Sequence, residues 1–146
     1  MTQTIETLST LTARDLMSEA CGTIQRGASL REVVERFLTG PSRHLIVVDE
    51  DGRCLGILGP RHIAQAHRFD PRGDREVPVE DLGYAPWIAL RPEDGLRTCA
   101  QMLVEHELDA IPVLDAERRV LGVVTVHDIA RAAADAAGHV HPHWEE

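Results

Sequence analysis

The stretch Leu121-Gly122-Val123-Val124-Thr125-Val126-His127-Asp128-Ile129 lies 66 positions after a similar stretch, Leu55-Gly56-Ile57-Leu58-Gly59-Pro60-Arg61-His62-Ile63. The same shift aligns further identical residues without a gap: Asp15-Leu16 with Asp81-Leu82, Leu30-Arg31 with Leu96-Arg97, Val47 with Val113, and Asp49 with Asp115. A gap-free register over about fifty residues indicates an internal duplication. Such a duplication defines the architecture, so it is considered before the local secondary-structure patterns.

Each copy carries the same series of local patterns. A short apolar stretch, Thr23-Ile24 in one copy and Trp87-Ile88-Ala89-Leu90 in the other, precedes a helix with apolar residues at i, i+3, i+4, i+7 and i+8. These helices are expected near 30–38 and 96–104. Two β-rich runs joined by a polar turn come next. A closing helix follows, beginning near Pro60 or Val126, so each copy is predicted to be a β-α-β-β-α unit.

The expected fold class is α+β. The first repeat is expected over 12–67 and the second over 79–137, with a surface linker at 68–78 and flexible tails at 1–11 and 138–146. A unit of about fifty residues buries little surface alone, so the two repeats are expected to pack as one pseudo-two-fold body with a cleft between them.

Composition excludes several classes of protein. The 146 residues carry a net charge of −9, which opposes binding to nucleic acid. All 15 basic residues are Arg, and the absence of Lys excludes a Schiff-base or P-loop lysine. No apolar run approaches the length of a membrane span, and no secretion signal is evident, so a cytoplasmic protein is expected. The three cysteines form no metal or disulfide pattern, and no catalytic motif appears. The chain is therefore not expected to be an enzyme.

Three stretches resemble a known family: Arg14-Asp15-Leu16-Met17, Ile111-Pro112-Val113-Leu114-Asp115, and the stretch Leu121–Ile129 quoted above. Together they resemble a tandem pair of cystathionine-β-synthase (CBS) domains, also called a Bateman module, over about 12–136. The resemblance implies a stand-alone sensor or regulatory module without a catalytic cofactor. It further implies that the cleft binds an adenosine-type ligand, namely AMP, ADP, ATP or S-adenosylmethionine, and reports to a protein partner that the sequence does not identify.

The resemblance also implies a set of ligand-binding residues. Thr125 and Asp128 match the family positions that hold the ribose hydroxyls, and an ionised Asp is able to accept two hydrogen bonds from a vicinal diol. Adenine would lie against strand residues: Ile88, Ala89, Ile111 and Pro112.

The first copy departs from this pattern. It has Gly59 and His62 where the second copy has Thr125 and Asp128, so the ribose carboxylate is missing. Either this half-site is empty, or Arg61 and His62 neutralise the phosphates of a nucleotide held by Asp128.

Other interpretations stay open. Thr125 and Asp128 also form a helix N-cap with an acid at the third helical position, which stabilises a helix start without any ligand. The alternative function is therefore a ligand-free protein-interaction module of the same fold. A homodimer built from the paired helices is expected in either case. The C-terminal His139-x-His141-x-His143 could share a metal ion, but a mobile tail is preferred and no metal site is predicted.

Overall fold

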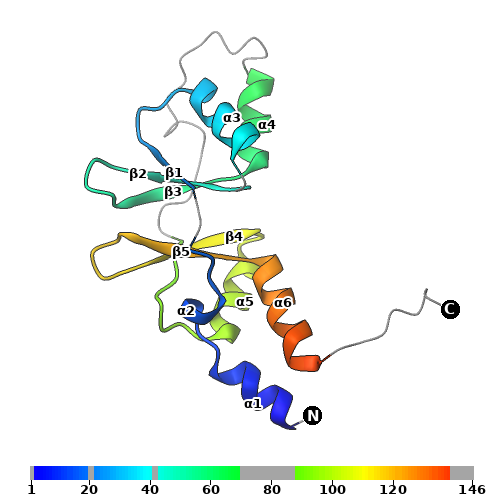
Figure 1. The fold of residues 1–146 in the computed structure, drawn as a ribbon. Helices are drawn as coiled ribbons and strands as arrows, with labels where there is room; N and C mark the ends of the chain where they lie inside the picture. Colours follow the sequence, from blue (N-terminus) through cyan, green and yellow to red (C-terminus); the bar gives the residue numbers. More distant parts are fainter. Residues whose placement is uncertain (1, 20–21, 41–42, 70–87, 139–146) are drawn as a thin grey trace, which may run out of the picture.

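The computed structural model describes residues 2–19, 22–40, 43–69 and 88–138. Two small sheets face each other across the middle of the molecule, and helices cover the outer side of each sheet (Figure 1). Helices α3 and α4 lie on one outer side, and helices α5 and α6 lie on the other. The chain therefore forms four layers, in the order helices, sheet, sheet, helices.

The first repeat has the predicted β-α-β-β-α order. Its elements are β1 (Gly22–Gln25), α3 (Leu30–Thr39), β2 (Leu45–Val48), β3 (Cys54–Leu58) and α4 (Pro60–Phe69). Strand β2 is central, with β1 parallel to it and β3 antiparallel to it. Ser29 caps α3 as expected, since its hydroxyl accepts a hydrogen bond from the backbone N–H of Glu32 at 3.2 Å. Helix α4 continues to Phe69, into the range expected for the linker, and residues 70–87 lie outside the described ranges.

The second repeat reproduces this arrangement. Its elements are α5 (Leu96–Glu105), β4 (Ala110–Leu114), β5 (Val120–Thr125) and α6 (Val126–Ala137). The opening strand is reduced to a parallel bridge between Leu90 and Val113, at the same register as the pair Ile24 and Val47 in the first repeat. The two hairpins even share a bulge, between Val47 and Val48 and again between Val113 and Leu114. This agreement confirms the duplication. Trp87 lies outside the described ranges.

The N-terminal segment packs on the second repeat. A flexible tail is expected over 1–11, but residues Thr2–Thr10 form helix α1, which contacts α5 and α6. Helix α2 (Ala13–Leu16) follows, and its residues Ala13 and Leu16 are buried in the second repeat's core. Backbone hydrogen bonds of 2.9 and 3.0 Å then join Ser18 to Val123 at the edge of β5. The segment that precedes the first repeat in the sequence therefore packs on the second repeat.

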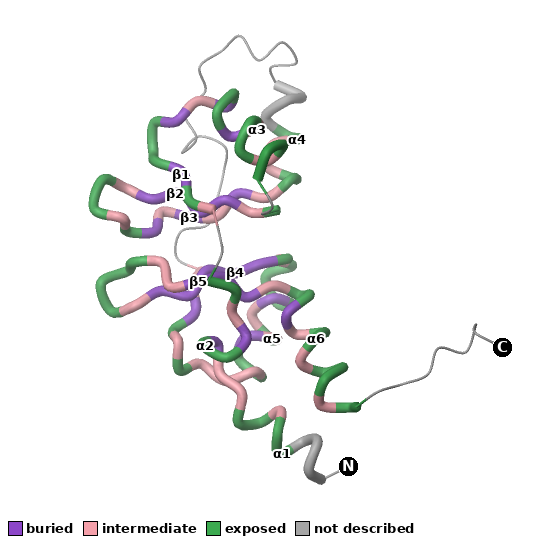
Figure 2. The backbone as a smooth tube through the Cα atoms, in the orientation of Figure 1, coloured by how far each residue is buried: buried purple, intermediate pink, exposed green. Residues whose placement is uncertain are grey.

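Apolar residues close the centre of the seam between the two sheets. A buried cluster joins Ile46, Val48 and Cys54 of the first repeat to Leu114 of the second. Figure 2 shows buried residues concentrated in the strands on both sides of this seam, with exposed residues on the outer helices. The expected cleft between the repeats is therefore filled at its centre.

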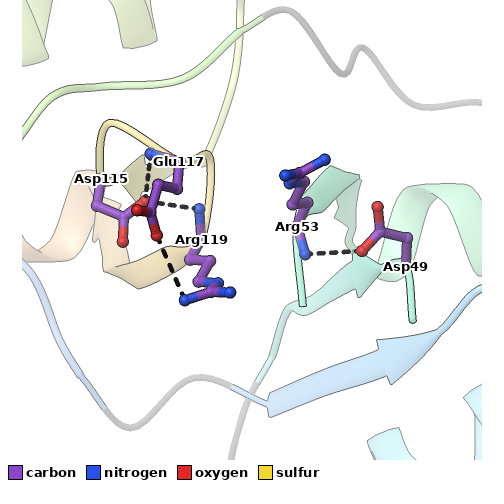
Figure 3. Close-up of polar contacts among 5 residues, drawn as sticks. All are labelled: Asp49, Arg53, Asp115, Glu117 and Arg119. Carbon is purple, nitrogen blue, oxygen red and sulfur yellow. Dashed lines mark hydrogen bonds and ion pairs between the residues drawn. The ribbon is translucent and has the colours of Figure 1, made fainter. Parts of the chain in front are cut away.

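The two hairpin turns meet at one end of the seam. Asp49 accepts a 2.9 Å hydrogen bond from the backbone N–H of Arg53, and Asp115 accepts an equivalent 2.9 Å bond from the backbone N–H of Arg119. Figure 3 shows both bonds as dashed lines. Arg53 and Arg119 form an antiparallel bridge between the repeats. The same turn chemistry therefore occurs twice and brings the two repeats into contact.

None of the helices in the described ranges is both long enough and apolar enough to span a lipid bilayer.

Candidate ligand site

Asp128 lies at the start of α6, where β5 ends at Thr125. One carboxylate oxygen, Oδ2, accepts hydrogen bonds from the backbone N–H of Thr125 at 2.8 Å and from its hydroxyl at 2.9 Å. The Thr125 hydroxyl oxygen in turn accepts a 3.1 Å bond from the backbone N–H of Asp128. These bonds form a reciprocal capping box, as the sequence predicts.

The Asp128 side chain is almost fully buried, with only 9% of the residue exposed. A carboxylate has two oxygens and about four lone-pair positions, and the bonds from Thr125 engage only Oδ2. The second oxygen therefore retains the capacity to accept hydrogen bonds from a ligand.

A cavity of about 430 Å³ adjoins Asp128. Helices α1, α2 and α6 form its walls, together with the segment that follows α2. Its lining residues are Thr7, Leu11, Asp15, Leu16, Met17, Ser18, Asp128, Arg131, Ala132, Asp135 and Ala136. The cavity therefore combines a buried carboxylate with two further acids, one arginine and several apolar side chains.

Sequence reasoning missed most of these lining residues. Arg131 and Asp135 follow Asp128 by three and seven residues. This spacing places the three side chains on one face of a helix, so the helical period would have predicted this part of the site. The same period does not predict Asp15 and Ser18 as site residues, because their approach to α6 depends on how the N-terminal segment packs.

The equivalent position in the first repeat has a different chemistry. There the backbone N–H of Gly59 donates a 3.0 Å hydrogen bond to Nδ1 of His62. Burial lowers the pKa of His62 below its ordinary value, and the charge of Arg61 lowers it further. An Nδ1 atom that accepts a hydrogen bond belongs to a neutral ring, so the remaining donor of His62 is Nε2–H.

A second histidine, His44, packs beside this turn. A Cβ atom placed on Gly59 would lie 3.3 Å from Cδ2 of His44. Burial lowers the pKa of His44, while the charge of Asp109 opposes this effect and the charge of His62 adds to it. No local pattern in the sequence connects His44 with His62.

The remaining candidate residues are dispersed. Ile111 is fully buried in the second repeat's core, and Ile88 packs against the same cluster. Pro112 is buried in β4, whereas Ala89 is half-buried and packs at the seam. Arg61 is exposed on α4. The structure therefore brings Thr125 and Asp128 together, but Ile111 presents no exposed surface, and neither Arg61 nor His62 lines the Asp128 cavity.

No cluster of three or more potential metal ligands occurs within the described ranges. The histidines at 139, 141 and 143 lie outside those ranges.

Comparison with known proteins identifies the repeat. The family model described as CBS domain matches residues 13–68 and 79–135. A homoserine O-acetyltransferase from Methanocorpusculum labreanum is 31% identical over 118 residues, which cover 81% of this chain but 23% of that protein. The chain therefore spans less than a quarter of that relative's length.

Two solved structures share the fold. CBSX2 in complex with AMP has a TM-score of 0.75 and 20% sequence identity, and the match covers 87% of this chain and 98% of that one. The CBS domain pair of protein MJ0100, in complex with 5′-methylthioadenosine and S-adenosyl-L-methionine, has a TM-score of 0.74 and 23% identity, covering 85% of this chain and 100% of that one. At these identities the likeness establishes the fold alone.

Proposed function

Because the chain belongs to the CBS-domain family, we propose that it is a non-enzymatic regulatory module that binds an adenosine-type ligand through Asp128 and Thr125. The observation that carries this proposal is the buried Asp128 carboxylate, which lines a cavity and has one oxygen outside the capping box. A ribose diol would donate to this carboxylate, and charge-assisted hydrogen bonds of this kind are among the stronger polar contacts. CBSX2 and the MJ0100 pair are described in complex with adenosine compounds, which supports this class of ligand.

The first repeat contributes differently in this proposal. His62 has no carboxylate for a diol, but its neutral ring presents Nε2–H, and the exposed Arg61 precedes it on α4. Because neither group lines the Asp128 cavity, they are proposed to contact the anionic part of a ligand that extends beyond that cavity. The adenine ring would then contact the half-buried side chains of Ile88 and Ala89.

Calorimetry with AMP, ADP, ATP and S-adenosylmethionine tests the proposal. Replacing Asp128 by Ala is expected to weaken binding by about thirty- to a hundredfold, which corresponds to about 2 to 3 kcal/mol. His62→Ala is the comparison at the equivalent position of the first repeat and is expected to weaken binding less, because its proposed contact is with the anionic part of the ligand and not with the ribose. Absence of binding by all four compounds at millimolar concentration would overturn the proposal.

A second candidate function has its own support. Thr125 and Asp128 satisfy each other as a helix cap, and this role needs no ligand. A protein-interaction module of the same fold would keep this cap, and Asp128→Ala would then lower the melting temperature by the same amount with and without nucleotide. The cap accounts for about 1 kcal/mol of stability, so thermal melts with and without ligand distinguish the two functions.

The proposed assembly is a homodimer. Leu38 on α3 is 80% exposed, beside an apolar groove between α3 and α4. The equivalent helices of the second repeat, α5 and α6, are in contact with α1, so among the described residues the uncovered helical face belongs to the first repeat. A second copy that brings the same face would cover both grooves at once, as a two-fold interface requires.

A further inference from the structure

A cleft of about 850 Å³ lies on the second repeat, beside the hairpin turn between β4 and β5. Its described lining includes three arginines, Arg14, Arg91 and Arg118, and two acidic residues, Glu93 and Asp115. The cleft thus has an excess of positive charge in a chain whose net charge is −9. None of the described residues that line the Asp128 cavity lines this cleft.

Among the described residues, neither acidic residue forms an ion pair with the three arginines. Asp115 directs Oδ1 into its own turn, where it accepts hydrogen bonds from the backbone N–H groups of Glu117 at 2.8 Å and Arg119 at 2.9 Å (Figure 3). Glu93 is exposed and forms no ion pair with a described residue. Within the described ranges, no side-chain hydrogen bond or ion pair engages the guanidinium groups of Arg14 or Arg91.

Hydrogen bonds hold the backbone at these three arginines. The N–H of Arg14 donates a 3.0 Å bond to the carbonyl of Pro92, and the N–H of Arg91 donates a 2.8 Å bond to the side chain of Asp94. Arg118 is attached to the first repeat, because its carbonyl accepts a 2.9 Å bond from the N–H of Cys54 and its guanidinium donates a 3.3 Å bond to the Cys54 carbonyl. The backbone therefore places the three exposed arginine side chains around one cleft, and the guanidinium of Arg118 is also held by a hydrogen bond.

The duplication provides an internal comparison for Arg118. Its φ of 67° lies in the left-handed region, and the equivalent residue of the first repeat is Gly52, with a φ of 82°. Glycine adopts this conformation without a steric penalty, whereas Arg does not. The turn itself needs only glycine, so the side chain of Arg118 is the feature that distinguishes the second turn from the first.

We propose that Arg14, Arg91 and Arg118 form an anion site for a phosphate chain, separate from the Asp128 cavity. Three guanidinium groups around one cleft match the several oxygens of a diphosphate or triphosphate, since each guanidinium is able to donate two parallel hydrogen bonds. The phosphate chain belongs either to a free oligophosphate or to a nucleotide, and both share this chemistry.

Calorimetry with pyrophosphate and tripolyphosphate at physiological ionic strength tests the site. Arg91→Ala removes a guanidinium that forms no described side-chain contact, and Arg118→Gly installs the residue that the first repeat uses. Each variant is expected to weaken pyrophosphate binding by about tenfold or more, because each removes charge-assisted hydrogen bonds. Arg118→Gly is also expected to fold normally, because glycine suits its backbone.

The controls separate this site from general charge and from the adenosine site. Arg97→Ala, on the exposed face of α5, removes the same charge outside the cleft and is expected to leave pyrophosphate affinity unchanged. Asp128→Ala is also expected to leave it unchanged. If Arg91→Ala lowers the affinity for ATP but not for adenosine, the bound phosphate chain belongs to a nucleotide. If the variant lowers the affinity for pyrophosphate alone, the phosphate chain is a free oligophosphate. No pyrophosphate or tripolyphosphate binding at millimolar concentration, or equal weakening by Arg97→Ala, would overturn the proposal.

Discussion

The backbone N–H of Gly59 donates a hydrogen bond to Nδ1 of His62 at 3.0 Å, in the place where the N–H of Thr125 donates to Asp128 at 2.8 Å. The two repeats therefore begin their closing helices with the same bond but with different acceptors. An imidazole accepts this bond only when Nδ1 is unprotonated, whereas a carboxylate accepts it throughout the neutral pH range. Protonation of Nδ1 of His62 would therefore break the cap of the first repeat.

We expect the free energy of unfolding to fall as the pH drops below about 6.5, the ordinary pKa of His. Burial lowers the pKa of His62 and of His44 in the folded protein, so the unfolded chain binds more protons in this range. Stability from such groups is present above the unfolded pKa and is lost as the pH falls through the folded pKa. Urea denaturation at about pH 8 and about pH 5.5 measures the loss.

The control for this prediction is His62→Asp, which places the residue type of position 128 at position 62. Its carboxylate would accept the Gly59 N–H at both pH values, so this variant should lose less stability than the unmutated protein. An equal loss in both proteins would show that His62 does not contribute to the pH dependence.

Replacing Gly95 by Ser is expected to stabilise the protein by a few tenths of a kcal/mol. Gly95 is the N-cap of α5 and provides no side-chain hydrogen bond, whereas the equivalent Ser29 caps α3 with its hydroxyl. The backbone of Gly95 is extended, with a φ of −74°, and an added Cβ would meet nothing within 4 Å. Thermal denaturation measures the effect, and an unchanged or lower melting temperature would contradict it.

Gly122→Ala is expected to destabilise the protein by about 1 to 3 kcal/mol, the range for overpacking in a tight site. A Cβ at this position would lie 2.7 Å from the backbone oxygen of Ser18 and 2.9 Å from the sulfur of Met17. The Ser18 oxygen is held by a bond from Val123, so it has little freedom to move. Urea denaturation measures the change, with Gly95→Ser as the comparison at a glycine that has open space.

The sequence predicted the elements of the fold because their causes are local or repeated. The apolar stripe of each first helix, the polar hairpin turns and the capping box at Thr125 and Asp128 all appear in the structure. What the sequence did not predict depends on long-range packing. The docking of α1 and α2 on the second repeat forms the Asp128 cavity, and no local pattern encodes that contact.

The turn at Arg118 escaped prediction for a different reason. A left-handed residue in a hairpin turn is expected to be glycine, as Gly52 is, so an arginine at the aligned position gives no turn signal. Only the structure shows that Arg118 has the same backbone conformation and contacts Cys54.

Cys99 is expected to resist alkylation in the folded protein. Burial raises the pKa of its thiol to about 11, and the charge of Asp94 contributes to the rise. At about pH 8 only about one thiol in a thousand would be ionised, and the thiolate is the reactive form. Iodoacetamide labelling followed by peptide mapping measures this, with urea-unfolded protein as the positive control. Rapid labelling of Cys99 without urea would contradict the expectation.

Leu38→Glu is expected to convert the proposed homodimer to monomer. Leu38 is the most exposed large apolar residue in the described ranges and lines the groove between α3 and α4 together with Phe37 and Ile63. A carboxylate from each copy would be buried at a two-fold interface without a partner, which costs several kcal/mol. Light scattering at micromolar concentration measures the mass of both proteins.

Val104→Glu provides the matched control for the dimer. Val104 lies on α5 of the second repeat and is 77% exposed, but it does not line the groove. This variant is expected to keep the dimer, because the interface is assigned to the first repeat. A monomeric unmutated protein would reject the homodimer. Dissociation by Val104→Glu, with Leu38→Glu remaining dimeric, would instead place the interface on the second repeat.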